Sequence, residues 1–201
     1  MNLSYTSDRP LSAWRVHGIL SRHEGFTVIE MMVALTVAVI LMGTAIPAFS
    51  RMSAQNHLAS TANDFVSAFA SARQAAIQLS TPVTVCAGDS SGCFSTVEWS
   101  RGWVMFVDDD RDGALDTNER VLYSGITRRN DVHVAGNHPM QKSVIFTPQG
   151  FAVQPGGAFS AGTLRVCVTA RIDDNARNLV LSKGGRLRVD RADYAGACPA
   201  L

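Results

Sequence analysis

An acidic segment in the middle of the chain has the spacing of a calcium-binding loop. Asp108-x-Asp110-x-Asp112-Gly113, followed by Glu119, fits the twelve-residue EF-hand pattern at each specified position. Calcium prefers oxygen ligands, and a divalent cation would relieve the repulsion among these acids. The flanking segments have the composition of strands rather than helices, so a solvated hairpin turn explains the same residues. The candidate calcium ligands are Asp108, Asp110, Asp112 and Glu119.

A second charged segment, near the C-terminus, has the opposite sign. Residues 177–191 contain five cations and one acid, Asp190. In an extended segment, Arg186 and Arg188 project to one face because side chains alternate. Two guanidinium groups on one face suit the phosphate oxygens of successive nucleotides, although a charged edge strand protected against aggregation has the same composition. The candidate DNA contacts are Lys183, Arg186, Arg188 and Arg191.

The sequence offers little support for catalysis. Residues 88–92 (GDSSG) match the G-x-S-x-G nucleophile motif, but that motif requires a helix after it and β-like sequence follows here. The five histidines are scattered, and neither H-E-x-x-H nor a paired-carboxylate pattern is evident. We therefore expect that the protein is not an enzyme and has no cofactor other than the candidate calcium ion.

The composition and one apolar run determine the class of protein. Of the 201 residues, 46% are hydrophobic and 17% are charged, and the net charge is +1. These values exclude a disordered chain and a globally basic nucleic-acid-binding protein. Residues 31–50 contain no charge and lie between Glu30 and Arg51. About twenty residues of helix cross the ~30 Å hydrocarbon core of a bilayer, so this run predicts a single membrane span.

The segment just before this run, GFTVIE at residues 25–30, closely resembles the class III leader of type IV pilins and type II secretion pseudopilins. The resemblance implies that an inner-membrane prepilin peptidase cleaves between Gly25 and Phe26 and methylates the new N-terminal Phe26. Glu30 becomes the fifth residue of the mature chain. We expect its carboxylate to pair with the Phe26 amine during assembly; a position in the headgroup layer is the alternative. The positive excess of the leader predicts a cytoplasmic N-terminus.

The elements that follow predict an α+β, pilin-like fold. Apolar residues recur at three- and four-residue steps from Leu58 to Ile77, and Pro82 follows, so we expect one helix over 26–79. The remainder contains short β-branched and aromatic segments between turn signals, which predict an antiparallel sheet wrapped on the second half of the helix. The expected strands are 82–86, 103–107, 121–123, 132–135, 143–147, 163–169, 178–181 and 187–189.

These elements give a domain organisation. Residues 1–25 form the leader peptide, and residues 26–50 form the transmembrane half of the helix. Residues 51–201 form a periplasmic domain, with an amphipathic helix over 51–79 and a β-rich part over 82–201.

The four cysteines of this domain are most simply two disulfides in an oxidising compartment. Three pairings are possible, and Cys86–Cys93 with Cys167–Cys198 is the one that joins nearest neighbours. Four free thiols are the alternative. A metal site is less favoured, because neither a C-x-x-C motif nor clustered histidines accompany the cysteines.

The segment WSRGW at residues 99–103, between Cys86 and the acidic loop, resembles the branch of the pilin family that contains FimT and pseudopilin H. The sequence GRLR at residues 185–188 resembles the DNA-contacting motif of FimT minor pilins that act in natural transformation. The resemblance implies a type IV pilus minor pilin that assembles with other pilins and binds DNA. The alternative is the pseudopilin H of a type II secretion system, a structural component of the fibre tip.

The leader motif generates a first prediction. Gly25→Val is expected to leave a full-length, unmethylated precursor in the inner membrane, because the peptidase accepts a residue without a side chain at this position. Mass spectrometry of the N-terminal peptide measures the outcome. A mature N-methyl-phenylalanine terminus in this variant would contradict the assignment of the cleavage site.

Overall fold

The computed structural model describes residues 25–127 and 131–201 of the chain. The predicted leader, except for Gly25, lies outside these residues. The chain forms two compact units, Met1–Gly43 and Thr44–Leu201, which divide within one helix. Helix α1 (Val28–Leu79) therefore contributes its first part to one unit and its second part to the other.

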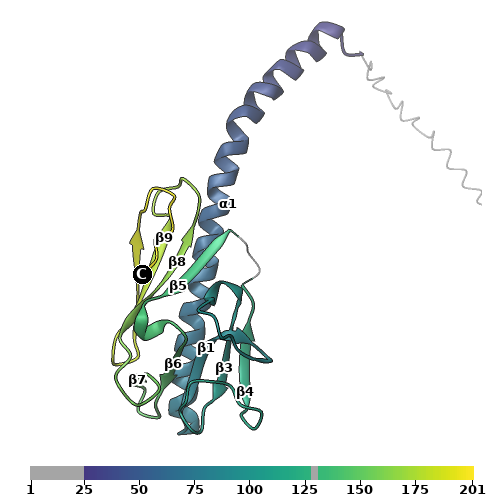
Figure 1. The fold of residues 1–201 in the computed structure, drawn as a ribbon. Coiled ribbons are helices and arrows are strands. Elements are labelled where there is room, and N and C mark those ends of the chain that lie inside the picture. The colour runs from purple at the N-terminus through teal and green to yellow at the C-terminus, as the bar shows by residue number, and fades with distance from the viewer. Residues whose placement is uncertain (1–24, 128–130) are drawn as a thin grey trace, which may run out of the picture. The chain divides into compact units, whose positions relative to one another are not determined.

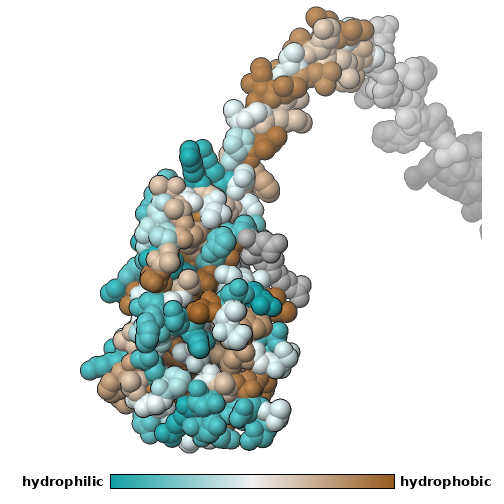
Figure 2. All heavy atoms as spheres, viewed as in Figure 1, coloured by the Kyte–Doolittle hydropathy of each residue, from teal (hydrophilic) through white to brown (hydrophobic). Residues whose placement is uncertain are grey.

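Helix α1 confirms the expected long helix, although it begins two residues later than predicted. It runs for 52 residues and includes Pro47. It ends before Ser80, whose φ of 55° is the left-handed conformation that often terminates helices. Within the described residues, α1 is the helix that is long and apolar enough to cross a membrane. Figure 2 shows apolar side chains covering the surface of its first part, where the transmembrane half was predicted.

The second unit contains two antiparallel sheets, which lie along the second part of α1 (Figure 1). The first sheet has the strand order β4-β3-β1-β6-β7, and the short β2 pairs with the end of β1. Its strands are β1 (Val83–Asp89), β2 (Gly92–Cys93), β3 (Trp103–Val107), β4 (Val121–Gly125), β6 (Ser143–Phe146) and β7 (Ala152–Val153). The second sheet has the order β10-β9-β8-β5. Its strands are β5 (Val132–Gly136), β8 (Gly162–Val168), β9 (Ala176–Leu181) and β10 (Leu187–Ala192).

The predicted α+β fold, one long helix with antiparallel strands, is confirmed, and each of the eight predicted strands is present, but the strands form two sheets rather than the one expected. The chain leaves the first sheet after β4, adds β5 to the second sheet, returns for β6 and β7, and completes the second sheet with β8, β9 and β10. Turn signals in a sequence locate strands, but β5 pairs with β8, about thirty residues away along the chain. Such a pairing depends on which apolar faces meet, which local sequence does not reveal.

The core lies between one stripe of α1 and the inner faces of both sheets. Leu58, Phe65, Phe69 and Ala72 of α1 are buried. Trp99, in the short 3-10 helix η1 (Trp99–Arg101), is completely buried among them. Its ring centroid lies 5.9 Å from that of Phe65 and 6.0 Å from that of Phe69.

The indole of Trp99 also carries a polar link. Its Nε1–H donates to the carbonyl oxygens of Met140 and Gln141, each at 3.0 Å. These residues belong to the connection that leads from β5 back to β6. Trp99 therefore joins the helix stripe to the segment by which the chain changes sheets.

Trp99→Phe is expected to lower the free energy of unfolding by about 1–3 kcal/mol, because the buried Met140 carbonyl and the partly buried Gln141 carbonyl lose their donor. Trp99→Ala is expected to cost about 3–5 kcal/mol, because the cavity adds to that loss. Urea unfolding of the detergent-solubilised chain, followed by near-UV circular dichroism, measures both. Tyr123→Phe, at an exposed ring, is the control. Equal stabilities of wild type and Trp99→Ala would contradict the central role of this residue.

Candidate functional sites

The predicted processing site lies immediately before α1, outside regular secondary structure. Gly25 and Phe26 precede the helix, and Phe26 is 83% exposed. A Cβ atom added at Gly25 would meet no heavy atom within 4 Å. The described part of the chain therefore leaves the Gly25–Phe26 bond open to a second protein, and a larger side chain at Gly25 would cause no clash within the fold.

Glu30 has a structural role that the sequence analysis missed. Its carboxylate accepts from the Thr27 backbone N–H at 2.8 Å and from the Thr27 hydroxyl at 2.9 Å. The Thr27 hydroxyl in turn accepts from the Glu30 N–H at 3.3 Å. This reciprocal pair is a capping box, for which T-x-x-E at the start of an apolar run is the sequence signal. In the uncleaved chain, Glu30 therefore caps α1, next to the position where cleavage would create the Phe26 amine.

The acidic loop connects β3 to β4 and folds back onto the first sheet. Asp108 is fully buried, and its carboxylate accepts from the Thr84 hydroxyl at 2.6 Å. The same carboxylate accepts from the backbone N–H groups of Arg111 at 2.7 Å and Gly113 at 3.1 Å. Burial raises the pKa of Asp108 above its usual value, against the lowering effect of these three donors. Asp108 thus anchors the loop, and the interpretation of this segment as a solvated turn does not hold for this residue.

The carboxylates expected to bind calcium are only partly brought together. Oxygen atoms of Asp108, Asp110 and Asp112 lie within 4.8 Å of one another. Glu119, in contrast, accepts from the backbone N–H groups of Asp109 and Asp116, both at 3.0 Å, so each of its oxygens has a partner within the loop. Burial raises the pKa of Glu119 as well. Three of the four candidate ligands therefore form one group, and calcium binding stays a prediction.

The G-x-S-x-G match forms a turn between two strands. Gly88 and Asp89 end β1, and Gly92 begins β2, so the helix that a nucleophile elbow requires is replaced by a hairpin. The Asp89 carboxylate accepts from the backbone N–H and the hydroxyl of Ser91. Hydrogen bonds within this turn account for Asp89 and Ser91.

A different Ser-His-Asp arrangement was not visible in the sequence. Ser53 Oγ lies 3.1 Å from His57 Nε2, and His57 Nδ1 lies 3.0 Å from Asp131 Oδ2. Acyl transfer would also need backbone N–H groups directed at an oxyanion, whereas Ser53 lies inside α1, where N–H groups bond along the helix. The contact ties the segment before β5 to α1.

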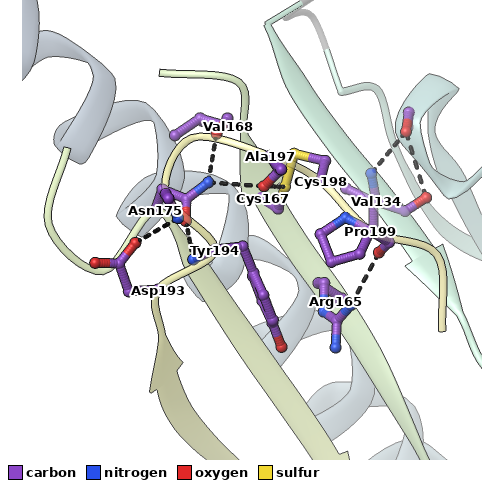
Figure 3. Close-up of a disulfide and its surroundings, with 12 residues drawn as sticks. Val134, Arg165, Cys167, Val168, Asn175, Asp193, Tyr194, Ala197, Cys198 and Pro199 are labelled. Atoms are coloured by element: carbon purple, nitrogen blue, oxygen red, sulfur yellow. Dashed lines mark hydrogen bonds between the residues drawn. A yellow bond between two sulfur atoms is a disulfide. The ribbon is translucent and has the colours of Figure 1, made fainter. Parts of the chain in front are cut away.

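The two disulfides pair the cysteines as nearest neighbours. Cys86–Cys93 joins β1 to β2, and Cys167–Cys198 joins β8 to the C-terminal tail. Figure 3 shows the second bridge and the tail that follows β10. The Arg165 guanidinium lies over the Tyr194 ring at 4.4 Å and donates to the carbonyl oxygen of Pro199 at 2.8 Å. The tail is therefore fastened across the outer face of the second sheet.

The basic segment forms the β9–β10 hairpin at the edge of the second sheet. The Ser182 N–H donates to the Arg186 carbonyl at 3.0 Å and closes the turn. Gly185 has a φ of 71°, and a Cβ atom there would clash with the Gly150 carbonyl oxygen. The glycine of the GRLR sequence thus lets the hairpin lie close against residues beside β7.

The structure separates the four candidate DNA contacts into two groups. Lys183, Arg186 and Arg188 are exposed, and Arg186 and Arg188 project to the same side because they are two residues apart. Leu187, between them, faces the core. Arg191 is three residues beyond Arg188 and therefore lies on the other face, 3.8 Å from Asp174. Arg188 Nη2 is 2.8 Å from Asp190 Oδ2.

Comparisons with known proteins agree with this architecture. A family model described as "Type II transport protein GspH" matches residues 61–185, and one described as "Prokaryotic N-terminal methylation motif" matches residues 20–46. No curated protein matches the chain.

Two crystal structures of the type IV minor pilin FimU from Pseudomonas aeruginosa share the fold. One has a TM-score of 0.52 at 18% identity and covers 71% of this chain and 97% of its own. The other has a TM-score of 0.50 at 17% identity and covers 70% of this chain and 100% of its own.

The GspH model covers more than half of the chain, and the methylation motif spans the Gly25–Phe26 bond in front of an apolar helix. The chain therefore belongs to the GspH family and is a minor pilin or pseudopilin of a type IV pilus-like system.

Proposed function

We propose that this chain is a FimT-like minor pilin that binds DNA for natural transformation. In this proposal, prepilin peptidase cleaves after Gly25 and methylates Phe26, and the apolar part of α1 anchors the subunit in the inner membrane and then in the fibre. The observation that carries the DNA-binding role is the exposure of Arg186 and Arg188 on one side of the β9–β10 hairpin.

The charge around this hairpin supports an anionic ligand. Residues 175–189 contain no Asp or Glu, and Asp190 lies in an exposed pair with Arg188. Exposed ion pairs contribute little to stability, so a phosphate can replace Asp190 as the partner of Arg188 at little cost. Because Arg191 lies on the other face of β10, we assign phosphate contacts to Arg186 and Arg188, with Lys183 beside them.

The location of the domain belongs to the same proposal. We place residues 51–201 in the periplasm, as the charge of the leader predicts. Two disulfides suit that oxidising compartment.

The match to the GspH model favours a second candidate function. In this alternative, the chain is the pseudopilin H of a type II secretion system and has only a structural role in the fibre. The long helix and the cleavage motif are common to both candidates. Pilus genes or secretion genes beside this one would distinguish them, as would the DNA-binding test below.

Replacement of Glu30 tests its role in assembly. Glu30→Ala removes both the charge and the capping box, whereas Glu30→Gln retains a side chain that can cap the helix but lacks the charge. If the carboxylate pairs with the Phe26 amine, both variants should be cleaved normally, and incorporation into sheared fibres should fall in both. Quantitative immunoblotting of the fibre and membrane fractions measures this. Normal incorporation of Glu30→Gln would mean that helix capping alone explains the residue.

A salt titration tests DNA binding. The detergent-solubilised chain should bind duplex DNA with little sequence preference, and the log–log slope against salt should reflect about 0.9 per phosphate contacted. Arg186→Gln with Arg188→Gln should reduce that slope by roughly two contacts. The melting temperature should stay unchanged, because both side chains are exposed.

The matched control is Arg111→Gln with Arg120→Gln, which removes the same charge from the loop on the other sheet. Equal losses in the two double variants would indicate a general charge effect. Absence of binding by the wild type at low salt would overturn the DNA-binding proposal and favour pseudopilin H.

A further inference from the structure

Two exposed aromatic rings lie beside the basic hairpin. Phe151 is 46% exposed and Phe159 is 61% exposed. Their ring centroids are 6.4 Å apart, with an interplanar angle of 69°. These rings flank β7 and the turn that follows it, at the opposite edge of the first sheet from β4. Two phenylalanine rings in contact with water are less favourable in free energy than two rings buried in the core. An exposed pair is therefore a candidate for binding a ligand.

Backbone contacts join these rings to the hairpin that carries the arginines. The Ala152 N–H, next to Phe151, donates to the Lys183 carbonyl at 3.1 Å. Arg73 Nε donates to the Gly150 carbonyl at 2.9 Å, and Gly185 lies against the same two residues. The Lys183 ammonium lies 5.9 Å from the centroid of the Phe159 ring. The aromatic pair and the cationic turn therefore form one continuous surface.

The segments that form this surface contain no acid, although Gly113 of the acidic loop lies close to Pro155, in the turn between the two rings. Residues 132–172 contain no Asp or Glu, and neither do residues 175–189. Phe151, Phe159 and the turn at Lys183 and Arg186 all belong to these two segments. An anionic partner can therefore approach the rings without meeting an acid from either segment. The cations of the turn attract such a partner, which an apolar patch without cations would not do.

We propose that Phe151 and Phe159 form a stacking platform for the bases of single-stranded nucleic acid, with Lys183 and Arg186 holding the adjoining phosphates. This inference rests on the proposed DNA-binding function and specifies the form of the ligand. Bases in a duplex are stacked on each other, and only an unpaired strand presents its π-faces to aromatic side chains. Stacking is tolerant of sequence because every base has such a face.

Lys183 connects the two parts of the site. A cation–π contact at 5.9 Å is at the outer limit of that interaction, and the side chain is flexible. When a phosphate arrives, the ammonium leaves the Phe159 ring for the phosphate and uncovers the ring for the attached base. One movement of Lys183 thus pairs the phosphate with a cation and exposes the ring on which the attached base stacks.

The test compares two fluorescently labelled probes, an oligothymidine and a duplex of the same length, by anisotropy with the detergent-solubilised chain. Phe151→Ala with Phe159→Ala should reduce affinity for the oligothymidine by at least about fivefold, which corresponds to the loss of one stacked base. Duplex affinity and the salt slope should stay as in the wild type, because no charge changes. Tyr123→Ala, an exposed ring on β4, is the matched control and should alter neither probe.

A second variant guards against a loss of fold. Phe151→Leu with Phe159→Leu keeps apolar side chains but removes the π-faces, and it should lose oligothymidine affinity to a similar extent. Retention of oligothymidine affinity in the leucine variant, while the wild type binds both probes, would overturn the stacking platform and leave the DNA-binding proposal intact. Failure of the wild type to bind either probe would overturn both.

Discussion

The burial of one stripe of α1 against two sheets is the constraint on which the rest of the domain depends. Leu58, Phe65 and Phe69 on one face of the helix belong to a single core cluster with buried residues of both sheets. The second sheet covers what the first one leaves, and Trp99 fills the space where the two meet. As a consequence, the chain crosses from one sheet to the other more than once, and the strand after each crossing pairs with a strand that is distant in the sequence.

This arrangement determines where the surface features lie. The Phe151–Phe159 pair flanks β7, where the chain leaves the first sheet for β8, whereas the acidic loop joins β3 to β4 within the first sheet and the β9–β10 hairpin lies within the second. None of these contributes a large share of the apolar core, so other interactions hold them. Gly185 allows close approach of backbone, Asp108 gathers donors beneath its loop, and Cys167–Cys198 fastens the tail. These interactions hold the backbone of each feature in place, and the candidate binding side chains can therefore point outward.

The start of α1 is stabilised differently, since most side chains of its first part are exposed. There the helix depends on its own hydrogen bonds and on the capping box of Thr27 and Glu30. The same carboxylate is the expected partner of the amine that processing would create. A residue that stabilises the precursor helix is therefore also the one that assembly is proposed to use, because a buried or interfacial carboxylate needs a partner in either state.

Local patterns in the sequence determined the helix, the eight longer strands and the family resemblance. Periodicity, turn residues and the GFTVIE segment at residues 25–30 act over a few residues, so they are readable without a structure. Only the tertiary structure decided that there are two sheets, because β5 finds its partner in β8 through the faces that meet. It also placed Arg191 beside Asp174, gave Glu119 partners of its own, and brought Phe159 beside Lys183. The sequence records which side chains are present, but their neighbours across the chain depend on long-range packing that no local spacing encodes.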